Sequence, residues 1–292
     1  MSAMKKWAKN TQRSHIIVEH NDDSGSVDEQ AYIKKLTSDV RVVSIVHTSP
    51  VTGMTVDLEK ITKEVRNVTP DCIIIVDGIQ HSSHGAIDVQ KYDIDGYVVS
   101  PYKMFSRHGY GVAWASERLC TLNKEQLADG PFQNWELGTR DAGSYATFSD
   151  VVDYLDWLGS NFTESENTRE RLEASSIAIK SHEQELVDLV INGAEDIVGL
   201  RNNKKIRIIG NSASTSREGV VSFFHKNKPS SIIVEELRQR KIRVHIRKDD
   251  HYCGNILRPL NQKDCIRFSI CHYNSKAEVV EFMKAINEIS TN

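Results

Sequence analysis

The stretch Ile73-Ile74-Ile75-Val76-Asp77-Gly78-Ile79-Gln80, followed downstream by Ser100-Pro101-Tyr102-Lys103, decides the predicted fold. A run of branched apolar residues is typical of a parallel strand that is buried on both faces. The run ends in an acid, and ligand groups in open α/β sheets lie at the carboxyl ends of strands. A second apolar run, Gly96-Tyr97-Val98-Val99, then delivers a serine and a lysine to the same edge of the sheet.

An acid, a lysine and a small hydroxyl at one sheet edge suit pyridoxal phosphate. Asp77 would keep the pyridine nitrogen protonated, Lys103 would form a Schiff base, and Ser100 would bind the phosphate. Each residue also has an ordinary interpretation, because an Asp-Gly pair is common in turns and most lysines are exposed. We favour the cofactor interpretation because the residues occur together.

The wider pattern of strands and helices predicts an α/β protein. Strands are expected near residues 15–19, 40–46, 72–76, 96–100 and 110–115, with helices at 1–10, 27–36 and 58–65 between or before them. This alternation implies βαβ units and a mostly parallel sheet. Helices at 149–158 and 164–191 follow. The last part then combines strands near 205–209, 220–225, 243–246 and 265–270 with helices at 230–240 and 275–289.

The motifs together resemble the class V aminotransferase family of fold-type I. The resemblance is carried by Val76-Asp77-Gly78-x-Gln80, by Asp88-Val89, by Ser100-x-x-Lys103 and by the glycines at 109 and 111. The most similar branch is that of the cysteine desulfurases and desulfurase-like proteins. The resemblance implies a partial, N-terminally incomplete PLP-binding large domain over residues 1–159. A small C-terminal α+β domain over residues 160–292 would follow.

The resemblance also implies roles for the residues around the lysine. Lys103 would form an aldimine with the cofactor, Asp77 would pair with the pyridinium nitrogen, and Gln80 would donate to the phenolate oxygen. Ser100 would contact the phosphate. Tyr102 stands where the family usually has a phosphate-binding histidine, and a phenol can donate a hydrogen bond but is not cationic at neutral pH.

Two further segments resemble family motifs more loosely. His47-Thr48-Ser49-Pro50 ends a predicted strand and is similar to a cofactor-side family motif, with Pro50 in an asparagine position. A cofactor role and a buried structural role for His47 stay equally open. Thr139, in Glu136-Leu137-Gly138-Thr139, resembles a segment that reaches the neighbouring cofactor site across a homodimer. A simple loop is the alternative.

Substrate handling is expected in the last part of the chain. Arg267 lies in Cys265-Ile266-Arg267-Phe268-Ser269, which resembles the family strand whose arginine binds the substrate carboxylate. Cys253 lies in a predicted loop, where group II cysteine desulfurases place their persulfide cysteine. An incidental thiol is an equally strong interpretation of Cys253.

The composition limits the classes of partner and the cellular locations to be expected. The 292 residues carry a formal net charge of -3, which favours neither a nucleic-acid nor a membrane partner. No apolar stretch has the length of a membrane span, and the first residues lack the apolar core of a secretory signal. Five cysteines without a C-x-x-C pair indicate reduced thiols, a cytoplasmic location and no metal site.

Three functional hypotheses follow. The leading one is a PLP-dependent, cysteine desulfurase-like enzyme acting on a small amino acid. A second is an aminotransferase, lyase or epimerase of the same family, with Cys253 a bystander. A third is a truncated, non-catalytic paralogue that dimerises or binds a partner. It arises because the family's phosphate-binding loop and ring-stacking aromatic residue find no counterpart before residue 15. Their loss predicts PLP affinity lower by about a hundredfold and low activity of this chain alone.

Overall fold

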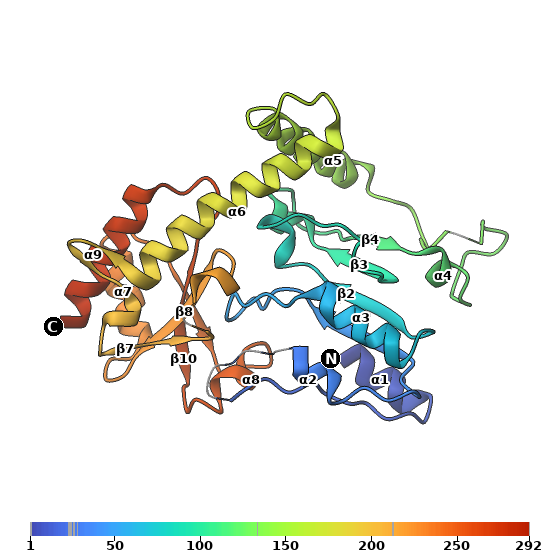
Figure 1. Cartoon of the computed structure of the whole chain (residues 1–292), viewed down its shortest axis with the longest axis horizontal. Helices are drawn as coiled ribbons and strands as arrows, with labels where there is room; N and C mark the ends of the chain where they lie inside the picture. Colours follow the sequence, from blue (N-terminus) through green and yellow to red (C-terminus); the bar gives the residue numbers. More distant parts are fainter. Residues whose placement is uncertain are drawn as a thin grey trace.

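The computed structural model describes residues 2–22, 25, 27, 29–132, 134–211 and 213–291. Two four-stranded sheets lie side by side, and the long helix α6 (Thr168–Asn192) runs from the neighbourhood of the first sheet to the second (Figure 1). The polypeptide completes the first sheet before it enters α6 and builds the second after leaving it.

The first sheet has the order β1-β2-β3-β4. Its strands are β1 (Val42–Val46), β2 (Ile73–Asp77), β3 (Gly96–Val99) and β4 (Val112–Ala115). The first three are parallel, and β4 pairs with β3 in the antiparallel direction. The predicted α/β class and mostly parallel sheet are therefore confirmed.

Helix α3 (Leu58–Val68) covers one face of this sheet because its apolar residues recur at helical spacing. The Asp57 side chain accepts a hydrogen bond from the Lys60 amide at 3.0 Å and so caps the helix at its start. Ile61 and Val65 are fully buried in the cluster that contains Ile45 and Ile74. Helices α1 (Ser2–Asn10) and α2 (Glu29–Ile33) precede this unit, and α4 (Glu117–Cys120) follows it.

One predicted strand is wrong. Residues 15–19 form no regular element, and Ile16 and Ile17 are half exposed. A strand needs a partner for its backbone groups, and here none of the described strands pairs with this segment. The apolar run at 15–18 therefore predicted more regularity than its surroundings support.

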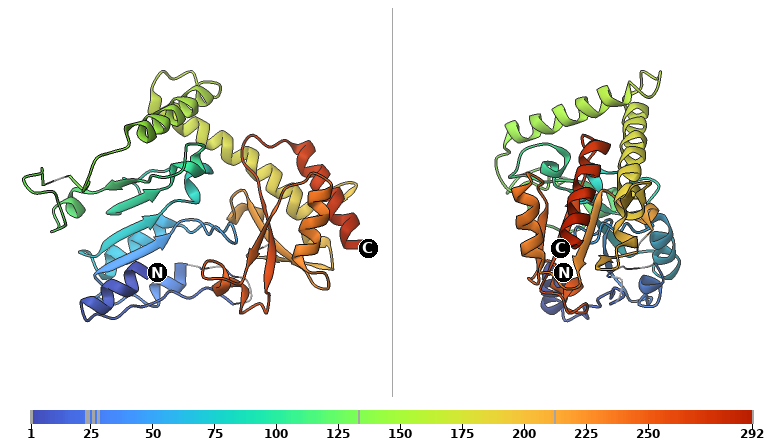
Figure 2. Two further views of the ribbon diagram at one scale, coloured as in Figure 1. Left: turned by 180° about the vertical axis from the view of Figure 1, so that it is seen from behind. Right: turned by 90° about the vertical axis from the view of Figure 1, so that its left-hand side faces the viewer.

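Helices α5 (Ala142–Gly159) and α6 contact each other where the chain turns sharply from one into the other (Figure 2). Gly159 ends α5, and a Cβ atom at this position would lie 1.9 Å from the Arg171 carbonyl oxygen. Only glycine permits the two helices to approach so closely. The domain boundary predicted at residue 159/160 coincides with this turn, and the division into two domains stays a prediction.

The second sheet has the order β7-β8-β10-β9 and is antiparallel throughout. Its strands are β7 (Ile206–Ile209), β8 (Val220–His225), β9 (His245–Lys248) and β10 (Asp264–Ser269). Helices α7 (Ser230–Gln239) and α9 (Lys276–Thr291) pack with α6 around it (Figure 2). The short helix α8 (Gly254–Leu257) and the small hairpin β5 (Gly193–Ala194)–β6 (Ile197–Val198) complete this part.

Phe223 and Phe282 anchor the core of the second sheet and are almost completely buried. Their rings meet edge to face, with centroids 6.4 Å apart. None of the described helices is both long enough and apolar enough to span a membrane.

Candidate active site

The carboxyl ends of β1, β2 and β3 form a continuous edge. The His47 amide donates to the Asp77 carbonyl at 3.0 Å, and the Gly78 amide donates to the Val98 carbonyl at 3.0 Å. A Cβ atom at position 78 would lie 2.1 Å from the Tyr97 ring. Glycine is therefore required where the chain leaves β2. Because Gly78 has no side chain, the Tyr97 ring can lie against the backbone at this point.

Lys103 lies just beyond the end of β3, in the single turn of 3₁₀ helix η2 (Pro101–Met104). Its Nζ donates to Oε1 of Gln80 at 3.0 Å, so the two predicted site residues are brought together. Burial lowers the pKa of the Lys103 ammonium, and the nearby charge of Arg267 lowers it further, whereas Asp77 acts in the opposite direction. The lysine thus lies in surroundings that favour a nucleophilic free amine.

Three other predicted site residues lie near the lysine in the sequence or act on its charge, and each makes contacts of its own: Asp77, Ser100 and Tyr102. Asp77 Oδ1 accepts from the Ile79 amide at 3.1 Å, the ordinary turn contact of an Asp-Gly pair, and still acts electrostatically on Lys103. Ser100 precedes η2, and its carbonyl accepts from the Lys103 amide at 2.9 Å. Tyr102 is 40% exposed, and its ring stacks on that of His108 with centroids 4.2 Å apart.

His47 is buried and satisfied by the protein itself. Its Nδ1 lies 2.9 Å from the Tyr97 hydroxyl, and its ring stacks on His81 with centroids 3.7 Å apart. Burial lowers the pKa of His47 to about 2, with the charges of His81 and Lys180 adding to the effect. His47 is therefore neutral. Its structural role is evident, and contact with a cofactor stays a prediction.

Two arginines of the second sheet act electrostatically on the lysine. Arg267, on β10, donates from Nη1 to the Pro50 carbonyl at 3.1 Å, while its buried Nε has no partner among the described residues. Burial and the charge of Arg247 lower the pKa of Arg267 to about 10, which leaves it cationic at neutral pH. Arg247, on β9, pairs in register with Cys265, and its Nε is likewise buried without a partner among the described residues. Unused guanidinium donors beside Lys103 suit a carboxylate or phosphate. Sequence reasoning missed Arg247.

Cys253 does not lie in an open loop. It is 1% exposed, precedes α8 and packs with Ile256, Leu257 and Cys265 in an apolar cluster. Burial raises the pKa of the Cys253 thiol. The predicted loop corresponds to turns at residues 249–253, directly before α8, and these turns direct the thiol into the apolar cluster. The expectation of an accessible thiolate has no support in this geometry.

Thr139 lies outside the group of residues around Lys103. It is exposed, in the segment 121–141 that projects from the body of the chain between α4 and α5 (Figure 1). The same segment exposes Phe132, Trp135 and Leu137 by about half of their surfaces, at 48%, 47% and 52%. Such a projecting apolar segment is typical of an interface between chains.

A buried hydrogen-bonded chain behind Lys103 also escaped the sequence analysis. Gln80 Nε2 lies 3.2 Å from His84 Nε2, and His84 Nδ1 lies 2.7 Å from Glu183 Oε2. His84 and Glu183 are 4% and 3% exposed. One signal was available: Glu183 occupies the same face of α6 as Ile179, Leu186 and Val190, where an apolar residue is expected.

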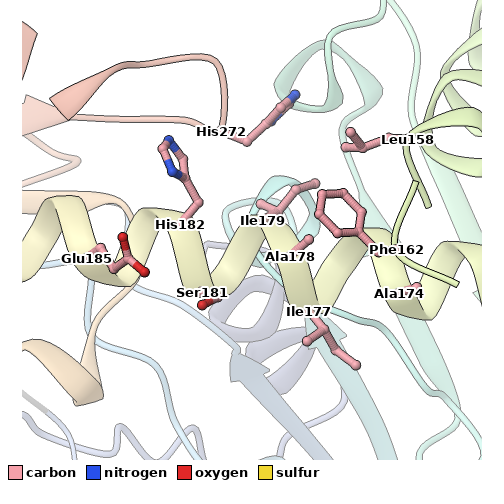
Figure 3. Close-up of a pocket in the computed structure, with 10 residues that line it drawn as sticks. All are labelled: Leu158, Phe162, Ala174, Ile177, Ala178, Ile179, Ser181, His182, Glu185 and His272. Carbon is pink, nitrogen blue, oxygen red and sulfur yellow. The ribbon is translucent and has the colours of Figure 1, made fainter. Parts of the chain in front are cut away.

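A groove lies apart from the carboxyl edge of the first sheet. This groove of about 640 Å³ opens between α5, α6 and the segment after β10 (Figure 3). It is largely apolar, and none of the predicted site residues lines it; the lining residues are Leu158, Phe162, Ala174, Ile177, Ala178, Ile179, Ser181, His182, Glu185 and His272. Within the described parts of the chain, no group of three or more His, Cys, Asp or Glu side chains could hold a metal ion.

Comparisons with known proteins bear on the identity of the site. The family model for aminotransferase class V matches residues 2–282. A cysteine desulfurase of Synechococcus elongatus is 27% identical over 289 residues, which cover 92% of this chain and 41% of that protein. A probable cysteine desulfurase of Treponema pallidum is 23% identical, with 92% of this chain and 63% of that protein covered. The chain thus spans about two fifths to two thirds of the length of these curated relatives.

Solved structures show the same fold. The apo cysteine desulfurase of Thermococcus onnurineus superimposes with a TM-score of 0.78 at 20% identity, covering 98% of this chain and 68% of that one. The Escherichia coli cysteine desulfurase CsdA superimposes with a TM-score of 0.76 at 20% identity, covering 97% and 67%. The family model matches nearly the whole of this chain, and the chain therefore belongs to the class V aminotransferase family.

Proposed function

We propose that this chain is the lysine-bearing part of a PLP-dependent enzyme that acts on a small amino acid. One observation carries the proposal: the half-buried Lys103 lies at the end of β3, hydrogen-bonded to Gln80 and within electrostatic range of Asp77, Arg247 and Arg267. An amine of lowered pKa, a carboxylate and two cations with unused donors are the groups that bind this cofactor and an amino-acid carboxylate.

The residues present fit the cofactor. Asp77 would hold the proton of the ring nitrogen, and Gln80 would donate to the phenolate oxygen. Ser100 and Tyr102 would contact the phosphate, and Lys103 would carry the amine that bonds to the cofactor and moves protons at the substrate. When bound, pyridoxal phosphate supplies an electron sink for negative charge at the substrate's α-carbon.

Arg267 would orient the substrate. Its buried Nε, which has no partner among the described residues, and its electrostatic interaction with Lys103 support a role in binding the carboxylate of the amino acid. A guanidinium binds a carboxylate through two parallel hydrogen bonds, which fixes orientation as well as position.

Within the family, two reaction branches compete. Cysteine desulfuration releases alanine and leaves a persulfide on a thiol of the enzyme, which requires a cysteine that the sulfur can reach. The burial of Cys253 favours the second candidate, an aminotransferase, lyase or epimerase in which Cys253 only packs. The comparisons with cysteine desulfurases favour the first.

The proposal includes the assembly of the enzyme and its cellular location. The exposed apolar residues of segment 121–141 support a homodimer in which Thr139 reaches the neighbouring site. The five cysteines are all unpaired, which supports a reducing, cytoplasmic location.

Product analysis tests the proposed activity. The chain is incubated with PLP and L-cysteine or L-alanine, and alanine, sulfide and keto acids are quantified. Turnover is expected to require Lys103, so that Lys103→Ala abolishes every product, while the exposed control Lys91→Ala retains them. Alanine and persulfide from cysteine identify the desulfurase branch. Full turnover by Lys103→Ala contradicts the proposal, and no product from either amino acid favours the non-catalytic alternative.

A further inference from the structure

The chain Lys103–Gln80–His84–Glu183 connects the amine of the first sheet to a carboxylate of α6. Its three links measure 3.0 Å, 3.2 Å and 2.7 Å. Glu183 is 3% exposed, and its second oxygen, Oε1, has no partner among the described residues. Burial raises the pKa of the Glu183 carboxyl, while the hydrogen bond and the charge of His84 act in the opposite direction, so the charge of Glu183 depends on His84.

The hydrogen bonds of this chain have two consistent directions. An ammonium has three donors and no acceptor, so a charged Lys103 requires the oxygen of the Gln80 amide. The NH₂ group of that amide then faces His84 Nε2, which must be unprotonated to accept. His84 is in that case neutral and donates to Glu183 through Nδ1.

A proton on His84 Nε2 reverses the chain. His84 then donates through both nitrogens, so the Gln80 amide must turn its oxygen toward His84 and its NH₂ group toward Lys103. Only a neutral amine can accept that hydrogen bond. One proton is thus held either at the lysine or at the histidine, and the Glu183 carboxylate stabilises it at the histidine.

We propose that Glu183 is a positioning residue of the lysine site: through His84 and Gln80 it orients the Gln80 amide and keeps Lys103 as a free amine. The relevance of this role to catalysis rests on the proposed function, but the coupling itself does not. Burial alone would lower the pKa of His84, yet the hydrogen bond and charge of Glu183 outweigh burial and raise it. The Gln80 amide in the structure has its oxygen toward Lys103, which is the first direction, and a proton on His84 Nε2 would turn it to the second. Burial and Arg267 lower the pKa of Lys103 and so favour the loss of its proton.

Other charges also face these groups. Glu218 and Lys103 act on His84 electrostatically, Lys180 and Arg217 line the small space beside it, and the His272 ring interacts with it. Glu218 makes its own buried pair with His81, and the His81 ring stacks on that of His47 and not on the groups that lead to Lys103. Among the described residues there are therefore two buried histidine–carboxylate pairs, of which one leads to the lysine.

Competitive acylation tests the coupling without any cofactor. The full chain is treated with a trace of acetic anhydride between about pH 7 and pH 11, and the Lys103 peptide is quantified by mass spectrometry against that of exposed Lys91. Glu183→Gln preserves shape but removes the charge that holds the proton on His84. We expect the pKa of Lys103 to rise by about one unit, which reduces its acylation about tenfold at pH values below both pKa values.

Glu218→Gln is the matched control, because Glu218 acts on His84 through its charge alone and makes no hydrogen bond to it, so this variant should shift the Lys103 profile much less than Glu183→Gln. If Glu183→Gln does not fold, His84→Asn interrupts the same chain and should produce the same shift. A wild-type Lys103 profile in Glu183→Gln or His84→Asn, or equal shifts in the Glu183 and Glu218 variants, overturns the proposal. Failure of the chain to bind PLP would refute the proposed function and leave this result standing.

Discussion

At the scale of single residues, the candidate site combines Lys103, whose charged form is disfavoured, with Arg247 and Arg267. Each arginine has a buried Nε without a partner among the described residues. Lys103 and Arg267 come from different sheets, and neither is neutralised by a direct carboxylate partner in the described structure. Desolvation makes such an arrangement costly in the free protein. An anionic ligand would offset this cost, because its oxygens would accept hydrogen bonds from the guanidinium and from the lysine.

Arg267 provides the first prediction. Arg267→Lys keeps the charge but loses the two-pronged contact, so KM for any amino-acid substrate should rise by about ten- to a hundredfold, equivalent to about 1.5–3 kcal/mol for a charged hydrogen bond. Steady-state kinetics with several amino acids measure the effect. Arg258→Lys, at an exposed arginine of the same half, serves as the control. An unchanged KM in the Arg267 variant would remove this residue from the substrate site.

Cys253 provides the second prediction, which concerns the reactivity of its thiol. Because its thiol is buried and its pKa raised, iodoacetamide at about pH 8 should label the half-buried Cys120 well before Cys253 in the folded chain. In denaturant the two thiols should react at similar rates. Peptide mass spectrometry over time gives the order. Rapid native labelling of Cys253 would restore it as a candidate sulfur acceptor.

At the scale of elements, a buried carboxylate holds the first sheet together. Asp95 is 1% exposed and accepts hydrogen bonds from Arg66, Arg118 and the Ile74 amide at 2.7–3.0 Å. It therefore links α3, β2, β3 and α4 on the side of the sheet away from Lys103. Burial opposes its charge, but the hydrogen bonds from Arg118 and Ile74 outweigh burial and lower its pKa.

Asp95→Asn is expected to lower the free energy of unfolding by about 3 kcal/mol, because two arginines lose a buried partner. The lowered folded-state pKa implies stability that is present above the unfolded value of about 3.9 and lost as the pH falls through the folded value. Denaturant melts at neutral and acidic pH measure both effects. Asp93→Asn, an exposed partner of the same Arg66, should be nearly neutral. Equal losses in both variants would contradict this account.

The elements also show what sequence can predict. The strands ending at Asp77 and at Val99 were predictable because apolar runs and turn residues are local signals, and these strands brought Lys103 to Gln80 as expected. Arg247, His84 and Glu183 were not, because their roles depend on how the second sheet and α6 meet the first. The burial of Cys253 was not predictable for a similar reason, because it depends on how the turns before α8 pack.

At the scale of the whole molecule, the two sheets meet through buried polar contacts. Arg217 is 3% exposed and donates to the carbonyls of Thr52, Ile209 and Asn211, thereby joining the loop after β1 to the start of the second half. The two histidine–carboxylate pairs cross the same boundary. The relative position of Lys103 and Arg267 is consequently set by contacts that are expensive to break.

The projecting segment 121–141 gives a prediction about assembly. If its apolar residues form a homodimer interface, Trp135→Asp should weaken dimerisation and shift the sedimentation coefficient toward that of a monomer. Trp7→Asp alters a similarly exposed tryptophan on α1 and should leave assembly unchanged. Sedimentation velocity at several concentrations distinguishes the two. A monomeric wild-type chain, or a dimeric Trp135 variant of unchanged affinity, would contradict this interface.

The central claim is that Lys103 is the amine to which pyridoxal phosphate bonds, and trapping tests it most directly. The chain is saturated with PLP, reduced with borohydride, digested and mapped by mass spectrometry. We predict that the phosphopyridoxyl group is found on the peptide containing Lys103. Lys103→Arg should abolish the specific label and Lys91→Arg should not. A label that is found on another lysine, or that survives in Lys103→Arg, would contradict the account.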